Sequence, residues 1–372
     1  MSKLFAESSI NGMVLKNRFV RASIWEGLAT TEGEVTPELV KMLTTLAKGG
    51  VGLIVSSYSY VSLEGQGAPW QLGIYRDELI PKLQEMTSAV HENGCKIIMQ
   101  LAHAGQFAEE RITGRPALAV SASDDFTERY VKIITREDVQ RIVSSYSQAA
   151  KRAQDAGFDG IEIHSAQDCI LSQFLSPAFN ARHDEYGGSI DNRTRIHLMI
   201  YRSIRKLVGE AYPIVIKINC GDFIEDGITI DDSLYIAKMF SDTGFDAIEI
   251  TGGIIRTGKL SLGRADISSA DKESYLKDYA FRYKKEISTP LILAGGLRSF
   301  QVAEKIISDG IADYISMSRP FIREPDLINR WERGDLRKAE CKLDNLCFNP
   351  GVAGKGIYCV SRENEENKTA GH

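Results

Sequence analysis

The feature that most constrains this chain is a short pattern that recurs along it, in which a glycine and an acidic residue separate a helical stretch from an apolar strand. Its three clear copies read AGFDGIEIH from Ala156, TGFDAIEIT from Thr243 and DGIADYISMS from Asp309, and a looser copy, KGGVGLIVSS, begins at Lys48. The glycine supplies a left-handed helix cap, and the β-branched run favours a strand buried on both faces. This alternation predicts βα units and a parallel sheet.

Eight segments fit such strands, and helical patterns lie between them. The strands are expected at residues 18–23, 52–57, 96–101, 160–164, 214–219, 247–251, 291–294 and 314–318, and the helices at 37–47, 79–93, 139–153, 192–208, 231–242, 272–286 and 300–308. Eight strands with intervening helices predict an α/β fold, a (β/α)8 TIM barrel, here with an N-terminal hairpin and long loops at its C-terminal face. The alternative is a doubly wound sheet, but no G-x-G-x-x-G turn follows the first strand.

The chain is expected to divide into a barrel, residues 1–335, and a C-terminal extension, residues 336–372, with a polar, frayed tail from residue 362. The longest breaks in the pattern are at 102–134, 165–191 and 252–271. All three follow strands and therefore belong to the catalytic face of a barrel, where long loops usually carry function.

Composition excludes several other classes of protein. The chain has 372 residues, of which 43% are hydrophobic and 26% charged, as in a soluble globular protein. Its net charge of −5 gives no basic footprint for nucleic acid, and it has neither a membrane-spanning apolar run nor a signal-peptide core. Six cysteines in so long a chain do not indicate a disulfide framework. A cytoplasmic protein is expected, and assembly into a homo-oligomer stays open.

Polar residues and glycines stand where the strands end, which is where barrels place their working side chains. In chain order they are Ser23, Ser57 and Tyr58, Gln100, His164, Lys217, Thr251, Gly295 and Gly296, and Ser318 and Arg319. The last two pairs follow strands seven and eight, where barrels commonly hold a phosphate, and Arg319 adds a bidentate partner for its oxygens. Alternatively, the glycines only shape a tight turn, and His164 is a hydrogen-bonded structural residue.

The chain resembles the old yellow enzyme family of FMN-dependent NADH:flavin oxidoreductases. The matching segments are INGMVLKNRFVRAS, MQLAHAGQ, GFDGIEIH leading to QFLSPAFNARHDEYGGSIDNR, LAGGLRS and SMSRPFIREPDL, and they extend from about Leu4 to Pro325. The DEYGGSIDNR block is the most specific of them. The resemblance implies a TIM barrel that binds FMN at its C-terminal face and takes reducing equivalents from NADH or NADPH.

By motif position, the resemblance also implies the cofactor-binding residues. They are Ala22, Ser23, Ile24, Trp25, Tyr58, Gln100, His164, Lys217, Gly295, Gly296, Ser318 and Arg319. Gln100 would bond the pyrimidine edge of the flavin, and Lys217 takes the place of the family's basic residue near N1 and O2, where a cation stabilises reduced flavin. Lys217 could instead be a lysine paired to a carboxylate at the barrel mouth.

In the family, hydride passes from the nicotinamide to flavin N5 and then to the β-carbon of an activated alkene, typically an enone or enal. His164 matches the first of two side chains that polarise the substrate carbonyl. The second is usually His or Asn and here is Gln167, whose amide can still donate a hydrogen bond. The usual proton-donating Tyr is replaced by Cys169, either a thiol donor or a small buried hydrophobe.

Trp25 and Tyr58 are bulkier than the residues common at these positions, and either narrow the pocket, stack near the flavin or fill core. These departures leave alternatives to ene reduction of an α,β-unsaturated carbonyl or related electrophile. One is a flavin dehydrogenase or demethylase of the same fold. Another is an FMN-binding protein that no longer reduces alkenes. A third is a flavin-free barrel lyase or isomerase that uses the phosphate site for its substrate.

The C-terminal extension carries Cys341, Cys347 and Cys359, and Asp344 stands where a further cysteine would be expected from larger relatives with a [4Fe–4S] cluster. Such a cluster normally takes four thiolates. The sequence therefore favours a remnant turn with free thiols, and no metal is expected.

Overall fold

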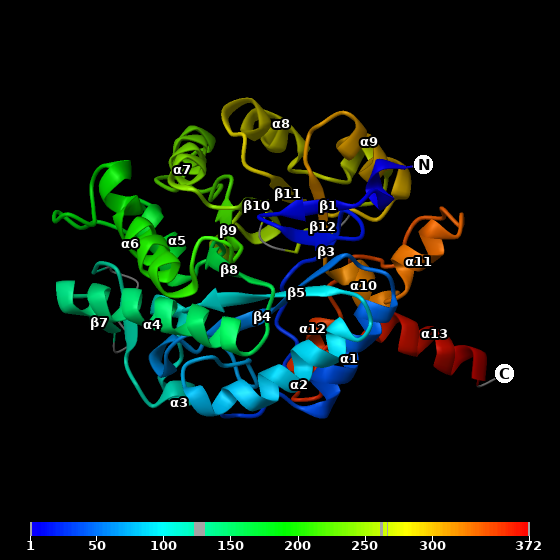
Figure 1. The fold of residues 1–372 in the computed structure, drawn as a ribbon, viewed down its shortest axis with the longest axis horizontal. Helices are drawn as coiled ribbons and strands as arrows, with labels where there is room; N and C mark the ends of the chain where they lie inside the picture. Colours follow the sequence, from blue (N-terminus) through cyan, green and yellow to red (C-terminus); the bar gives the residue numbers. More distant parts are fainter. Residues whose placement is uncertain (1, 123–130, 261–262, 266, 371–372) are drawn as a thin grey trace.

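The computed structural model describes residues 2–122, 131–260, 263–265 and 267–370. Its centre is a closed barrel of eight parallel strands: β3 (Phe19–Arg21), β4 (Leu53–Tyr60), β5 (Lys96–Ala102), β8 (Gly160–Ser165), β9 (Ile214–Asn219), β10 (Ala247–Thr251), β11 (Leu291–Ala294) and β12 (Tyr314–Met317). The strands follow one another around the barrel in chain order, and β12 closes it by pairing with β3 (Figure 1). The predicted TIM barrel and its eight strands are confirmed.

Helices surround the barrel because the strands are apolar on both faces and need cover outside as well as inside. They are α1 (Pro37–Lys48), α2 (Ile80–His91), α4 (Arg136–Asp155), α6 (Ile190–Val208), α7 (Ile230–Thr243), α8 (Lys277–Glu286) and α9 (Phe300–Ser308). Four of them begin after a Ser or Thr whose hydroxyl accepts a backbone N–H, namely α1, α4, α6 and α7. Such caps fix where each helix starts.

The expected N-terminal hairpin closes one end of the barrel. It consists of the antiparallel strands β1 (Ser8–Ile10) and β2 (Met13–Leu15). Ile10, Met13 and Leu15 pack in one cluster with the inward-facing residues Val20, Leu53, Val55, Ile98, Val215, Ala247, Ile292 and Tyr314. In Figure 1 the hairpin lies across the barrel strands. Because apolar side chains fill this end, polar groups can gather only at the other.

Shorter elements occupy the segments that were expected as long loops. The first holds η4 (Gly105–Phe107), α3 (Glu110–Thr113), β6 (Ala117–Ala119) and β7 (Val131–Ile133), the second α5 (Ile170–Leu175), and the third η6 (Ile255–Leu260) and η7 (Ala270–Lys272). Further short helices near the barrel are η1 (Lys3–Phe5), η2 (Leu63–Gly65) and η3 (Asp77–Leu79). No helix in the described part of the chain is both long and apolar enough to cross a membrane.

The helix expected at residues 272–286 was predicted too long. α8 begins only at Lys277, because Ser274 has a positive φ of 53° that interrupts any helix. Glu273 explains the break. Its buried carboxylate accepts hydrogen bonds from the backbone N–H groups of Arg298 (3.0 Å) and Ser299 (2.9 Å), which ties this segment to the loop after β11.

The expectation of a frayed tail from residue 362 was wrong over the part that the structure describes. After α10 (Arg319–Arg323), α11 (Leu327–Glu332) and α12 (Phe348–Val352), the chain ends in helix α13 (Val360–Ala370). Glu365 holds this helix in place through ion pairs with Arg323 (2.5 Å) and Lys342 (2.6 Å). The last two residues, 371 and 372, lie outside the described part.

Candidate active site

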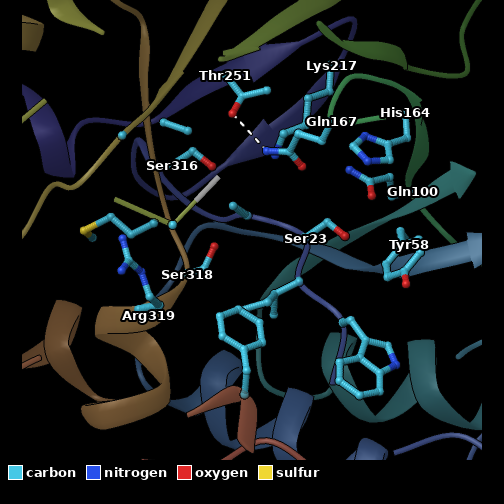
Figure 2. A pocket seen from close by; sticks show the side chains of 18 of the residues that line it. Ser23, Tyr58, Gln100, His164, Gln167, Lys217, Thr251, Ser316, Ser318 and Arg319 are labelled. Atoms are coloured by element: carbon cyan, nitrogen blue, oxygen red, sulfur yellow. Dashed lines mark hydrogen bonds between the residues drawn. The ribbon is translucent and has the colours of Figure 1, made fainter. Parts of the chain in front are cut away.

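The carboxyl-terminal end of the barrel holds a cavity of about 560 Å³, within the range of cofactor and ligand sites. Residues at or near the carboxyl-terminal end of every barrel strand line it. They include all the catalytic and cofactor-binding residues expected from the sequence: Ala22, Ser23, Ile24, Trp25, Tyr58, Gln100, His164, Gln167, Cys169, Lys217, Gly295, Gly296, Ser318 and Arg319. The structure therefore brings the whole predicted set together, with Ser318 and Arg319 at the opposite side from Gln100, His164 and Tyr58 (Figure 2).

One side of the cavity is suited to an anion. The guanidinium of Arg319 donates to Asn345 Oδ1 (2.7 Å) and to the carbonyls of Arg264 (3.1 Å) and Leu343 (3.3 Å), and no carboxylate of the described residues forms an ion pair with it. Gly296 has a φ of 70°, and a Cβ there would lie 2.3 Å from Ile267 Cδ1 and 3.0 Å from the Tyr275 ring. The backbone is therefore open only because this residue is glycine.

The opposite side presents hydrogen-bond donors. Lys217 lines the cavity and also donates to Glu249 Oε1 at 2.8 Å, so it is both a cavity residue and a paired lysine. Burial by itself lowers the pKa of Lys217, but the carboxyl groups of Glu249 and Glu162 outweigh this and raise it, so the ammonium group stays charged. The Oγ of Ser23 is buried and has no hydrogen-bond partner among the described residues.

His164 is an uncharged imidazole at this side. Burial lowers its pKa to about 3, and the nearby charge of Lys217 acts in the same direction. Its Nδ1 is buried without a hydrogen-bond partner in the described part of the chain, and its ring centroid lies 6.5 Å from that of Tyr58. A neutral imidazole keeps one N–H to donate and one nitrogen to accept.

Gln167 reaches the cavity because two consecutive residues adopt left-handed backbone conformations. Gln167 has a φ of 59° and Asp168 a φ of 66°, and the backbone N–H of Gln167 donates to Asn219 Oδ1 at 3.3 Å. The side-chain amide then donates to Thr251 Oγ1 at 3.0 Å (Figure 2). One of its two amide protons is used in this bond, which leaves the other for a ligand.

Two buried acids near His164 keep their protons. Burial, with a further contribution from Asp168, raises the pKa of the Cys169 thiol well above its usual value. Burial likewise raises the pKa of the Tyr58 phenol, with smaller contributions from Cys169 and Glu26. Cys169 directly precedes α5. Both groups are therefore proton donors in principle and are not nucleophilic anions.

The sequence analysis did not predict that residues away from the strand ends also line the cavity. Tyr275, from the segment that ties Glu273 to the barrel, lines it, and so do Leu343, Asn345 and Phe348 of the C-terminal extension. The ring of Trp25 supports this extension: a Cβ on Gly351 would lie 3.1 Å from it. No local pattern marks these residues, since each acts only through contacts distant in sequence.

The three C-terminal cysteines lie together but outside the main cavity. Cys341, Cys347 and Cys359 line a small cavity of about 20 Å³ with Arg323 and Asp344. Cys359 Sγ accepts a hydrogen bond from Arg323 at 3.8 Å. Within the described residues, no three His, Cys, Asp or Glu side chains are arranged to hold a metal ion.

Comparison with known proteins gives a consistent result. The family model of the NADH:flavin oxidoreductase / NADH oxidase family matches residues 3–337. The chain is 33% identical to an NADH oxidase of Thermoanaerobacter brockii over 95% of its own length and 57% of that protein. It is also 33% identical to an NADPH dehydrogenase of Bacillus subtilis (strain 168), over 87% of the chain and 92% of the relative.

Structural comparison agrees. An old yellow enzyme homologue from Zymomonas mobilis superimposes with a TM-score of 0.77 at 27% identity, over 92% of this chain and 96% of that one. The chain spans about half the length of the first two curated relatives that it matches.

The cavity fits the cofactor of this family. An uncompensated guanidinium and the open backbone at Gly296 suit the phosphate of FMN, and the buried Ser23 hydroxyl, Gln100 and the charged Lys217 suit the polar edge of a flavin. The resemblance inferred from the sequence is confirmed by the family match over nearly the whole barrel. The chain belongs to the NADH:flavin oxidoreductase / NADH oxidase family, of the old yellow enzyme type, whose cofactors are FMN and NADH or NADPH.

Proposed function

We propose that this protein is an FMN-dependent oxidoreductase that uses NADH or NADPH to reduce an α,β-unsaturated carbonyl compound or a related electrophile. One observation carries the proposal: a neutral His164 and the side-chain amide of Gln167 line the same cavity, in which His164 lies opposite to Arg319 (Figure 2). Two neutral donors are the arrangement needed to polarise a carbonyl oxygen.

The cofactor would lie between the two sides of the cavity. Arg319, Ser318 and the glycines Gly295 and Gly296 would hold its phosphate. Ala22, Ser23, Ile24, Trp25 and Tyr58 would line its ring system, and Gln100 and Lys217 would bond its pyrimidine edge, with His164 close by. When bound, FMN accepts a hydride from the nicotinamide and supplies it to the substrate.

The substrate oxygen would accept two hydrogen bonds, one from His164 and one from the amide proton of Gln167 that Thr251 does not use. These bonds strengthen as negative charge develops on the oxygen, so they favour the transition state over the ground state. Because His164 is uncharged, it stabilises the oxygen without giving up its own proton at neutral pH.

Reduction of the double bond also needs a proton at the carbon next to the carbonyl. Cys169 and Tyr58 both line the cavity, and burial holds the pKa of each well above its usual value. Each therefore keeps a proton at neutral pH. We propose Cys169 as the donor, because it follows Gln167 on the same turn, and Tyr58 as the alternative.

Anaerobic stopped-flow spectroscopy tests the function. NADH and NADPH are each mixed with the FMN-loaded protein, and the reduced protein is then mixed with a panel of cyclic enones, enals and nitroalkenes. We expect the flavin absorbance to be lost in the first step and to return with at least one of the alkenes in the second.

Other results would identify the alternatives. Reduction by secondary or tertiary amines without a nicotinamide would indicate a dehydrogenase or demethylase. Reduction by a nicotinamide with no reoxidation by any alkene would indicate a protein that binds FMN without reducing alkenes. A protein that takes up no FMN would contradict the proposal altogether.

A further inference from the structure

Two glutamates lie inside the barrel, immediately below the residues that line the cavity. Glu162 on β8 and Glu249 on β10 are fully buried, and neither lines the cavity itself. β8, β10 and β12 alternate with other strands around the barrel, and side chains from alternate strands share one interior layer. Glu162 and Glu249 thus form a polar layer between the cavity and the apolar core around the hairpin, and Ser316 of β12, which lines the cavity, contacts this layer.

Their hydrogen bonds lead directly to the cavity. Gln100 Nε2 donates to Glu162 Oε2 at 2.5 Å, and Lys217 Nζ donates to Glu249 Oε1 at 2.8 Å. Ser316 Oγ also donates to Glu249 Oε1, at 3.1 Å. The register explains these contacts, because Gln100 is paired with Glu162 and Lys217 with Glu249 on neighbouring strands.

One oxygen of each carboxyl group is left over. Glu162 Oε1 and Glu249 Oε2 are buried and accept no hydrogen bond from a donor of the described residues. Burial raises the pKa of Glu162, and the charge and the side chain of Glu249 raise it further. Two ionised carboxylates in this position would repel each other and leave both oxygens unsatisfied, whereas a single proton between them satisfies both.

The charge balance leads to the same conclusion. Lys217 supplies one positive charge, so two carboxylates would leave one net negative charge in a buried layer. Of the other titratable groups around this layer, His164 of β8 is uncharged, and burial raises the pKa of Tyr275, so it keeps its proton. One proton on the glutamates makes the layer neutral.

We propose that Glu162 and Glu249 share one proton, and that this carboxyl pair is a positioning element that orients Gln100 and Lys217 and sets the charge felt by the cofactor above them. The second half of the inference rests on the proposed placement of FMN in this cavity. With one proton on the pair, Lys217 faces one negative charge and not two. Loss of that proton would bring a second negative charge under the flavin and make its reduction less favourable.

Infrared spectroscopy at pH 7 tests the shared proton without relying on the flavin. A protonated carboxylic acid has a carbonyl band that ionised carboxylates lack and that shifts in D2O. We expect this band in the wild-type protein, with or without FMN, and its loss in Glu162→Gln, whose amide can donate to Glu249 and accept from Gln100 in the same way. Asp138→Asn is the control, because Asp138 is a buried carboxylate paired with Lys132 (2.8 Å) and Arg141 (2.9 Å). It should leave the band unchanged.

The midpoint potential of bound FMN tests the consequence. Glu162→Gln and Glu249→Gln each leave one carboxylate beside Lys217, so we expect neither variant to shift the potential at pH 7. The double variant leaves Lys217 without a counter-charge and should shift the potential to more positive values. Absence of the carbonyl band, together with a positive shift in each single variant, would show two ionised carboxylates and overturn the proposal.

A purely structural role would appear as a carbonyl band together with an unchanged potential in the double variant, which would overturn the electrostatic part. Thermal unfolding of each variant checks that it is folded, and if the double variant is not, the band and the two single variants still decide. Failure of the protein to bind FMN would contradict the proposed function, but the infrared result would still decide whether the proton is shared.

Discussion

Among single residues, His164 is the most direct test of the proposed chemistry. Replacing it with Ala removes one of two donors to the substrate oxygen, and a hydrogen bond to a charged group contributes about 1.5–3 kcal/mol. We expect His164→Ala to slow flavin reoxidation by an enone about tenfold to hundredfold, and to weaken the binding of phenolic ligands similarly. Rapid mixing and absorbance titration measure the two effects.

His103→Gln is a suitable control for that variant. His103 is as buried as His164, but it does not line the cavity. A loss of rate in His103→Gln equal to that in His164→Ala would attribute both effects to disturbed packing. Unchanged reoxidation and ligand affinity in His164→Ala would remove this residue from the mechanism.

Cys169 and Tyr58 make competing predictions about the proton. If Cys169 is the donor, Cys169→Ala slows reoxidation by an enone while reduction by the nicotinamide keeps its rate, and the solvent deuterium effect on reoxidation changes. If Tyr58 is the donor, Tyr58→Phe gives this result instead, and Cys169 is then a buried apolar residue. Normal reoxidation in both variants would mean that solvent supplies the proton.

The positions of the site residues could be predicted to the extent that they follow strand ends. His164, Lys217 and Arg319 were placed correctly on one edge because the βα pattern alone determines that edge. A carboxylate partner for Lys217 was among the alternatives, but the partners of Gln167 and Arg319 could not be predicted. The hydrogen bond from Gln167 to Thr251 depends on two successive left-handed residues, and Asn345 reaches Arg319 from the C-terminal extension. Neither contact leaves a local signal in the sequence.

At the scale of whole elements, the two errors have a common cause. The segment 272–276 has the composition of a helix, but Glu273 uses its carboxylate to bind the loop after β11, and this contact outweighs helical propensity. The tail from residue 362 has the composition of a disordered segment, but Glu365 in this tail forms ion pairs with Arg323 and Lys342. In both cases a contact between residues distant in sequence determines the backbone structure, which local helix propensity alone did not predict.

The C-terminal extension should contribute to cofactor binding, and two truncated chains test this. A chain that ends at residue 342 lacks Leu343, Asn345 and Phe348, all of which line the cavity. We expect its affinity for FMN, measured by quenching of flavin fluorescence, to fall at least about tenfold, the effect of losing about 1.4 kcal/mol.

The matched control for this truncation ends at residue 359 and lacks residues 360–372, which include α13. It keeps the three cavity residues and loses the ion pairs of Glu365 with Arg323 and Lys342, none of which lines the cavity. Its affinity for FMN should therefore be close to that of the whole chain. Equal affinities for all three chains would show that the extension is not part of the cofactor site.

For the whole molecule, buried titratable groups link stability to pH. Burial lowers the pKa of His103 to about 4 and those of His164 and His197 to about 3. In the unfolded chain these side chains titrate near their ordinary value of 6.5. Between these values each binds a proton only when the protein unfolds, so the free energy of unfolding falls as the pH falls through this window. Glu162 acts in the opposite direction, because its raised pKa lets the folded protein hold a proton that the unfolded chain releases.

The slope of the free energy of unfolding against pH is therefore proportional to the number of protons that the chain takes up when it unfolds. Between pH 5 and 6 the three histidines, less the one proton of Glu162, give a net uptake of about two protons on unfolding. Glu162→Gln removes the proton that Glu162 releases on unfolding. The free energy of unfolding of this variant should therefore change more steeply with pH, by about one proton, or about 1.4 kcal/mol per pH unit. The measurement is denaturant unfolding of the FMN-free protein at closely spaced pH values, which avoids titration of the cofactor phosphate. Parallel slopes for the wild-type protein and Glu162→Gln would mean that Glu162 is ionised in the folded barrel, and that Lys217 faces two negative charges.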